Sequence, residues 1–175
     1  GVQTCALPIW ADTDSVRTVQ TRSCSLRLTN TYGPKMRVKD ARQTFLGIWL
    51  RLLVENKPFE VWGGEQLRDF TYVDDIARGT LLALKPVGFD VFNLGGHEVI
   101  TMNQLLHKLE QLLGKKGNIT YIPSHPADVF ENVADVTKAR RELGWEPQVS
   151  LDEGLQRLVN WYIANRDWAK DVETP

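Results

Sequence analysis

Hydrophobic and polar positions repeat with two different periods along this chain, and the two periods follow one another. From Ser25 to Thr29, Leu26 and Leu28 alternate with polar residues, and this period of two predicts a short strand. The segment from Ala41 to Asn56 instead repeats its apolar residues at helical spacing, which predicts a helix. Its apolar positions are Phe45, Ile48, Trp49, Leu52 and Leu53.

The same two periods continue to the C-terminal end and predict an α/β arrangement. Thr101 with Gln104, and Ser150 with Glu153, form the capping-box pattern that begins a helix. The remaining predicted elements are strands at 59–62, 90–94 and 119–122, an extended segment through Phe70 and Tyr72, and helices at 73–85 and 135–143. Because the strands are few and short, we expect this piece to dock on a larger parallel sheet outside the chain.

The two ends of the chain differ from its middle. Residues 1–22 have neither period, and the start GVQTCALPIW lacks the charged region and cleavage pattern of a signal peptide. We interpret residues 1–22 as foreign to the fold, similar to translated adapter or out-of-frame sequence. The tail after Arg166 is polar, so residues 167–175 are expected to fray.

Composition and charge exclude several classes of function. The chain has 175 residues, of which 42% are hydrophobic and 25% charged, and this is typical of a globular domain. A net charge of −1 argues against nucleic acid and acidic membranes as partners, and the longest apolar runs are far short of a membrane span. Cys5 and Cys24 have no metal-like spacing, so we expect idle thiols in a reducing cytoplasm.

Two segments carry recognisable motifs. The segment from Leu26 to Pro34 reads LRLTNTYGP, and the segment from Trp62 to Asp75 reads WGGEQLRDFTYVDD. Together they resemble NAD-dependent nucleotide-sugar epimerases and dehydratases of the extended short-chain dehydrogenase/reductase family, most of all UDP-glucose 4-epimerases. The resemblance covers roughly residues 23–163 and implies the C-terminal part of a Rossmann-like protein, with its small substrate-binding α/β domain at residues 23–166.

The catalytic and cofactor-binding signatures of that family are missing from this sequence. A dinucleotide loop needs three spaced glycines between a strand and a helix, and no segment here has them. The family's catalytic pair is a tyrosine followed four residues later by a lysine. Tyr32, Tyr72, Tyr121 and Tyr162 are followed at that spacing by Met36, Ile76, His125 and Arg166. We therefore predict no catalytic residue in this chain, and NAD held mainly by an N-terminal half outside it.

The first motif contributes two candidate site residues. Asn30 follows the predicted strand, and ligands of open α/β sheets lie beyond the carboxyl ends of strands. From spacing alone, a role in satisfying the turn backbone is favoured, whereas the resemblance implies that Asn30 binds substrate. The resemblance also implies that the backbone of Leu28 meets the nicotinamide amide of NAD.

The second motif contributes Arg68 and Trp62. The planar fork of Arg68 suits a diphosphate, and the resemblance implies this role. The alternative is an exposed arginine paired with Asp69 or Glu65. The resemblance leaves Asp69 to orient the arginine or the local backbone. Trp62 has two interpretations of equal weight, namely stacking on a nucleotide base or burial in the core.

Two further candidates follow from the resemblance alone. Asp128 matches an aspartate that binds ribose hydroxyls, and the arginine expected three residues before it is replaced here by His125, which is no substitute for a fixed guanidinium. Arg42 stands at the start of a helix, where related decarboxylases and dehydratases carry a Gly-Arg pair. A solvated arginine is the alternative for Arg42.

No metal site is predicted. Asp74 and Asp75 are adjacent in a helix and do not share a face, so a capping and dipole role suffices for both. His97 and His107 have no partner at ligand spacing.

The sequence therefore predicts the nucleotide-sugar-binding half of an epimerase, inactive by itself. A UDP-glucuronate decarboxylase or dTDP-glucose 4,6-dehydratase fragment, a stand-alone sugar-nucleotide-binding module, and a chain that binds nothing remain open. Family members are often dimers, which leaves a homodimer open for the full-length parent.

Overall fold

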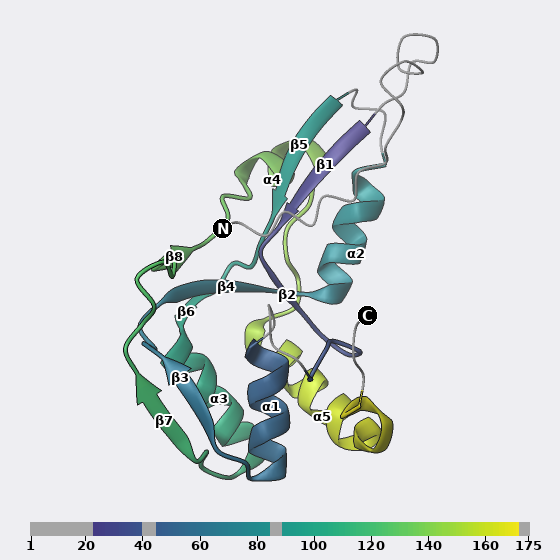
Figure 1. Ribbon diagram of the computed structural model, residues 1–175. Coiled ribbons are helices and arrows are strands. Elements are labelled where there is room, and N and C mark those ends of the chain that lie inside the picture. The colour runs from purple at the N-terminus through teal and green to yellow at the C-terminus, as the bar shows by residue number, and fades with distance from the viewer. Residues whose placement is uncertain (1–22, 40–44, 85–88, 172–175) are drawn as a thin grey trace, which may run out of the picture.

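The computed structural model describes residues 23–39, 45–84 and 89–171 (Figure 1). Strands and helices alternate along most of the chain, as predicted. The strands are β1 (Ser23–Leu28), β2 (Asn30–Tyr32), β3 (Phe59–Trp62), β4 (Leu67–Tyr72), β5 (Phe89–Leu94), β6 (Val99–Thr101), β7 (Ile119–Ile122) and β8 (Glu131–Asn132). The helices are α1 (Phe45–Glu55), α2 (Val73–Leu82), α3 (Met102–Leu113), α4 (Thr137–Leu143) and α5 (Leu151–Ala169).

The elements with strong local signals have the predicted bounds. Strands β3 and β7 begin and end where the sequence places them. Helix α3 begins after Thr101, whose hydroxyl accepts a hydrogen bond from the Gln104 backbone N–H, while the Gln104 side chain accepts one from the Thr101 N–H. The helix ends at Gly114, which has a φ of 65°.

Other elements differ from the prediction at their ends. Helix α5 runs to Ala169, past the fraying point predicted at Arg166, because Ala169 is buried in the core and Trp168 packs edge-on against Trp161. Helix α4 begins at Thr137, and Asp135 supports its start by accepting the Thr137 backbone N–H at 2.9 Å. Strands β2, β6 and β8 were not predicted.

The described strands form three small sheets. Strand β1 pairs with β5 in parallel, and β3 pairs with β7 in parallel. Strand β4 is the centre of the third sheet, where β2 and β8 are parallel to it and β6 is antiparallel. In Figure 1, β4 crosses between a group formed by β1, β5, α2 and α4 and a group formed by α1, α3, α5, β3 and β7.

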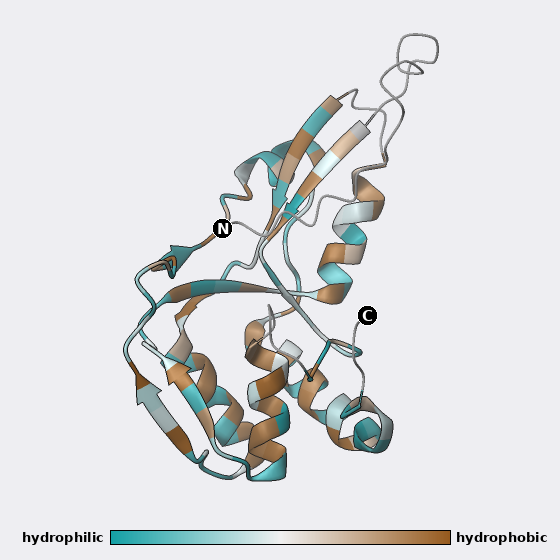
Figure 2. Ribbon diagram, in the orientation of Figure 1, coloured by the Kyte–Doolittle hydropathy of each residue, from teal (hydrophilic) through white to brown (hydrophobic). Residues whose placement is uncertain are grey.

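Each group of elements has its own core. The larger core lies among α1, α3 and α5, whose hydrophobic faces turn toward one another in Figure 2. Its most deeply buried side chains include Leu50, Leu105, Leu109, Leu155 and Leu158. The smaller core lies among β5, α2 and α4 and is built around the fully buried Phe92, Leu94 and Trp145. Burial of these apolar side chains is the main stabilising contribution in both groups.

Asp75 has a larger structural role than the dipole role predicted from its place in the first turn of α2. Its carboxylate is buried and accepts the backbone N–H groups of Gln148 and Val149, each at 3.0 Å. It also pairs with Arg78 at 2.8 Å. Asp75 therefore fixes the segment that leads into α5 against the start of α2.

Candidate functional site

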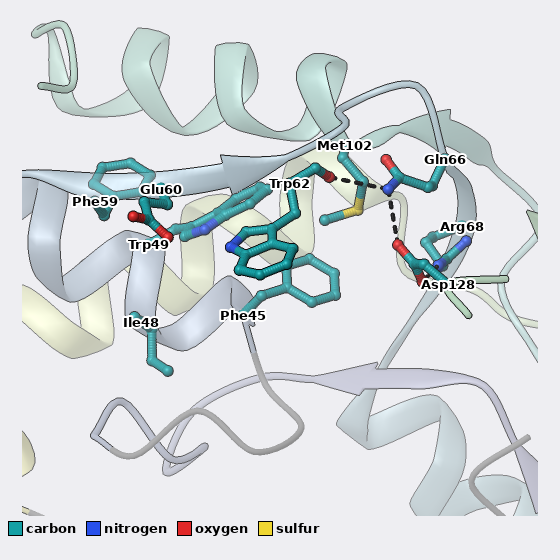
Figure 3. A pocket seen from close by; sticks show the side chains of 10 residues that line it. All are labelled: Phe45, Ile48, Trp49, Phe59, Glu60, Trp62, Gln66, Arg68, Met102 and Asp128. Atoms are coloured by element: carbon teal, nitrogen blue, oxygen red, sulfur yellow. Dashed lines mark hydrogen bonds and ion pairs between the residues drawn. The ribbon is translucent and has the colours of Figure 1, made fainter. Parts of the chain in front are cut away.

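A pocket of about 420 Å³ opens beside the C-terminal end of β3 (Figure 3). One side of it is apolar and the other is polar. The apolar side consists of Phe45, Ile48, Trp49, Phe59, Trp62 and Met102. The polar side consists of Gln66, Arg68 and Asp128, and Glu60 lies on β3 among the apolar residues. Such a combination suits a ligand with both a flat apolar part and a charged part.

Trp62 is exposed at the end of β3 because of the strand's alternation. Phe59 and Val61 point into the core, so Glu60 and Trp62 share the outer face. The Trp62 side chain is 49% exposed, so core burial, one of its two predicted interpretations, is wrong. An exposed indole at a pocket wall presents a flat face on which a base can stack.

The Gly63-Gly64 turn sends the chain from β3 back into β4. Both glycines have positive φ, 72° and 115°, and a Cβ on Gly64 would lie 2.4 Å from the Asn103 side-chain oxygen. A residue with a side chain would be strained at both positions. The turn places Gln66 beneath Trp62, where its amide oxygen accepts the Gly64 N–H at 2.8 Å.

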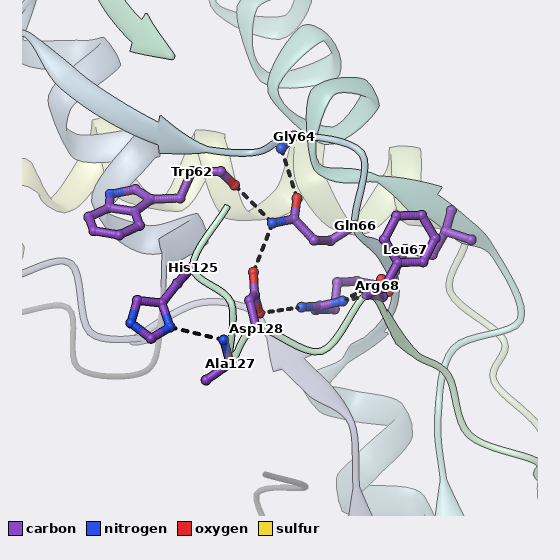
Figure 4. Close-up of polar contacts among 9 residues, drawn as sticks. Trp62, Gly64, Gln66, Leu67, Arg68, His125, Ala127 and Asp128 are labelled. Carbon is purple, nitrogen blue, oxygen red and sulfur yellow. Dashed lines mark hydrogen bonds and ion pairs between the residues drawn. The ribbon is translucent and has the colours of Figure 1, made fainter. Parts of the chain in front are cut away.

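Gln66 connects the two walls of the pocket. It is 4% exposed, and its amide nitrogen donates to the Trp62 carbonyl at 2.9 Å and to the Asp128 carboxylate at 2.8 Å (Figure 4). Gln66 was not predicted as a site residue. The available signal was its place between the Gly63-Gly64 turn and the candidate Arg68.

Arg68 is held in a fixed orientation by three hydrogen bonds. Its guanidinium donates to the carbonyls of Leu67 and Phe130 at 2.8 and 3.1 Å, and to the Asp128 carboxylate at 3.1 Å. The predicted alternative, an exposed arginine paired with Asp69 or Glu65, is wrong, since Arg68 is only 9% exposed and pairs with Asp128. The resulting arrangement places one cation and one anion at the polar side of the pocket.

Asn30 lies on the strand next to Arg68 but does not line the pocket. Strands β2 and β4 pair so that Asn30 is opposite Phe70, and the Asn30 amide donates to the Asp69 carbonyl at 2.9 Å. The acceptor is the backbone of the neighbouring strand β4, and not the backbone of the turn that the spacing favoured. The amide oxygen and the second N–H of Asn30 are the groups with which it could meet a substrate.

Asp69 is fully buried. Of its two predicted roles, orienting Arg68 or orienting the backbone, the hydrogen bonds show the second. The Asp69 carboxylate accepts the Ala134 N–H at 3.1 Å. Burial raises the pKa of the Asp69 carboxyl above its ordinary value, and the hydrogen bond from Ala134 opposes that rise without cancelling it. Asp69 therefore holds the segment after β8 against β4, next to the pocket.

Leu28 lies apart from the pocket. It is the last residue of β1, opposite Leu94 of β5, and packs against the smaller core. Arg42 lies outside the described residues. The apolar residues contributed by α1 were not predicted as site residues, because their periodicity indicates core positions. Glu60 and Met102 were not predicted as site residues either.

Within residues 23–39, 45–84 and 89–171, no group of three or more histidine, cysteine or acidic side chains could hold a metal ion. None of the helices in that same part of the chain is long and apolar enough to cross a bilayer.

A sequence profile of the NAD dependent epimerase/dehydratase family matches residues 9–95. The chain belongs to the NAD dependent epimerase/dehydratase family. This epimerase/dehydratase chain is 43% identical, over 85% of its length, to UDP-glucuronate 4-epimerase of Thermodesulfobacterium geofontis (strain OPF15). It is 32% identical, over 83% of its length, to UDP-glucuronic acid decarboxylase 1 of Arabidopsis thaliana.

Solved structures agree with the α/β fold of this epimerase/dehydratase chain. UDP-glucose 4-epimerase of Thermotoga maritima, solved with UDP-glucose, matches with a TM-score of 0.80 and 34% identity over 86% of this chain. The chain spans about half the length of the proteins it matches or less: 49% of that structure, 45% of the UDP-glucuronate 4-epimerase and 34% of the decarboxylase.

Proposed function

We propose that this chain is the substrate-binding portion of an NAD-dependent nucleotide-sugar epimerase or dehydratase, most like a UDP-sugar 4-epimerase. The observation that carries the proposal is the single pocket that joins the exposed indole of Trp62, the guanidinium of Arg68 and the carboxylate of Asp128. A nucleoside diphosphate sugar offers a matching set of groups, which are a flat base, anionic phosphates and ribose hydroxyls.

Each of these side chains has a chemical role in the proposal. Trp62 stacks on the base, and Asp128 accepts hydrogen bonds from ribose hydroxyls. Arg68 meets the diphosphate. Its hydrogen bonds to described residues engage three of its five N–H donors, so donors remain for a phosphate oxygen. Because those three hydrogen bonds already hold the guanidinium in place, little side-chain rotamer entropy is lost when the ligand binds.

Three further residues complete the proposed contacts. Asn30 uses its free amide groups on the sugar or a phosphate, and Arg42 adds a positive charge at the start of the segment leading into α1. Leu28 lies at the carboxyl end of a parallel strand, and its backbone there suits a contact with the nicotinamide amide. We propose that other parts of a longer protein hold the rest of NAD, which supplies hydride transfer at the sugar when bound.

The reaction of the whole protein is proposed as oxidation at sugar C4 followed by re-reduction. The decarboxylase relative leaves loss of a carboxyl group as the second candidate. The residues of this chain hold the nucleotide-sugar and exclude water from its base, and we expect no turnover from the chain alone. We expect it to work in the cytoplasm, where Cys24 stays reduced.

Calorimetric titration of the chain with UDP, UDP-glucose and UDP-glucuronate tests the proposal. We expect saturable binding of all three, weakened by Trp62→Ala by about tenfold, since base stacking contributes about 1–3 kcal/mol. Trp168→Ala is a matched control, because Trp168 is 50% exposed and Trp62 is 49% exposed. The proposal is wrong if no uridine nucleotide binds, or if the two variants weaken binding equally.

A further inference from the structure

His125 lies next to Trp62, although it does not line the pocket itself. It belongs to the loop between β7 and β8, in which residues 123–130 are all exposed. The centroids of the two rings are 6.4 Å apart and their planes are tilted by 40°. Figure 4 shows both rings on the side of Asp128 opposite Arg68.

A hydrogen bond fixes the orientation of the His125 ring. The backbone N–H of Ala127 donates to Nδ1 at 3.1 Å. Nδ1 must therefore be unprotonated, and the neutral ring carries its proton on Nε2. Because the loop's own backbone holds the imidazole, its face is presented beside Trp62 without any contribution from another element.

The spacing of the two rings is suited to a third flat ring. Aromatic side chains in direct contact have centroids about 4.5–7 Å apart, so a pair at 6.4 Å is close to the outer limit. A planar base between them would need about 7 Å, which is two contacts of roughly 3.5 Å each. To admit the base, the exposed loop would have to move by about half an ångström and turn the imidazole toward the plane of Trp62, since the two planes are tilted by 40°.

The order of the groups along the site supports the same conclusion. Trp62 and His125 lie at one end, Asp128 in the middle and Arg68 at the other end (Figure 4). A nucleoside diphosphate has its base, ribose and phosphates in that same order. The base would therefore reach the two rings when the ribose is at Asp128 and the phosphates are at Arg68.

We propose that Trp62 and His125 form a two-sided clamp for the nucleobase, and that His125 is a base-binding residue. The proposal rests on the proposed nucleotide-sugar function and adds a contact to it. Since stacking depends on a flat π-face and not on the hydrogen-bonding edge of the base, the clamp contributes affinity without selecting one pyrimidine over another.

The test measures the affinity of the chain for UDP and for 5,6-dihydrouridine diphosphate, whose base is neither aromatic nor planar. We expect His125→Ala to weaken UDP binding by about five- to tenfold and His125→Phe to restore most of the loss. Dihydrouridine diphosphate should respond to His125→Ala by less than about twofold, because it lacks a face to stack. His107→Ala, which removes another exposed histidine, should leave both affinities unchanged.

The variants separate the clamp from other roles of His125. Both substitutions remove the hydrogen bond from Ala127, so the comparison of alanine with phenylalanine isolates the ring. An equal loss for both ligands without rescue by phenylalanine would mean that His125 donates to a phosphate, and the clamp would be wrong. Unchanged UDP affinity in His125→Ala would also overturn it. Failure of the unaltered chain to bind UDP would overturn the proposed function together with the clamp.

Discussion

The guanidinium of Arg68 lies 3.1 Å from the carboxylate of Asp128, and this ion pair joins two segments that are 60 residues apart in the chain. Arg68 is anchored in the core sheet, whereas the Asp128 side chain is 36% exposed at the pocket rim. Gln66 holds the other carboxylate oxygen of Asp128. The Asp128 carboxylate therefore attaches the loop after β7 to the start of β4, together with the Phe130 carbonyl that accepts from Arg68, and the polar side of the pocket depends on that attachment.

Substitution Asp128→Asn should weaken UDP binding by about tenfold or more while the chain stays folded. The amide keeps the shape of the carboxylate but removes the charge that pairs with Arg68, and charge-assisted hydrogen bonds are about twice as strong as neutral ones. We expect unfolding free energy to fall by about 1 kcal/mol, because one partner is partly exposed. Calorimetry and urea denaturation measure the two effects.

A matched control for that substitution is Asp152→Asn. Asp152 forms an exposed ion pair with Lys108 on the surface, away from the pocket. Its loss should change unfolding free energy by less than about 0.5 kcal/mol and leave UDP binding unaltered. Equal effects of the two substitutions on UDP affinity would contradict the assignment of Asp128 to the site.

Substitution Gln66→Leu should lower the free energy of unfolding by about 2–3 kcal/mol. Leucine fills similar space but leaves the Gly64 N–H and the Trp62 carbonyl without their partner, and unsatisfied buried polar groups cost about 1–3 kcal/mol each. Gln156→Leu is the control, because Gln156 is exposed on α5 and bonds only Asn160 among the described side chains. Urea denaturation measures the free energy of unfolding of both variants. Equal values for Gln66→Leu and Gln156→Leu would contradict the structural role of Gln66.

The contribution of Asp69 to the free energy of unfolding should fall as the pH rises. Most carboxylates, whose pKa is lowered by folding, show the opposite trend. The pKa of Asp69 is raised in the folded chain, so between the ordinary carboxyl pKa of roughly 4 and the raised value the folded state binds more protons than the unfolded state. This contribution to stability is lost as pH rises through that window. Asp69→Asn cannot titrate, so its stability relative to the unaltered chain should improve as the pH rises from roughly 4 through the raised pKa of Asp69.

Chemical denaturation of the Asp69→Asn variant at several pH values across that window checks this expectation. Asp74→Asn, at an exposed position of α2, is the matched substitution against which the Asp69→Asn series is compared. A stability difference between Asp69→Asn and the unaltered chain that stays constant with pH would mean that burial does not perturb Asp69.

Substitution Thr101→Ala should destabilise the chain by about 1 kcal/mol. It removes the hydroxyl that accepts the Gln104 N–H at 3.1 Å and so breaks one half of the capping box of α3. Thr120→Ala is the control, because Thr120 lies within strand β7 and not at the start of a helix. Thermal unfolding followed by circular dichroism measures the difference, and an unchanged midpoint for Thr101→Ala would contradict the cap's role.

The sequence predicted most elements because their signals are local. A capping box such as Thr101 with Gln104 lies within four consecutive residues, and the alternation of Phe59 to Trp62 lies within one strand. Strands β2, β6 and β8 were missed because segments of two or three residues have no measurable period. The C-terminal end of α5 was predicted too early because the residues around Ala169 are polar. The burial of Ala169 depends on residues distant in the sequence.

By itself, the sequence determined the α/β class, the family resemblance and the identity of Trp62, Arg68 and Asp128 as candidates, since each of these is written in a contiguous motif. Only the tertiary structure decided that Trp62 is exposed, that Arg68 pairs with Asp128 and that Gln66 bridges the two walls. The hydrogen bonds from Gln66 and Arg68 to Asp128 join residues about 60 positions apart. A hydrogen bond forms only where folding brings its donor and acceptor together.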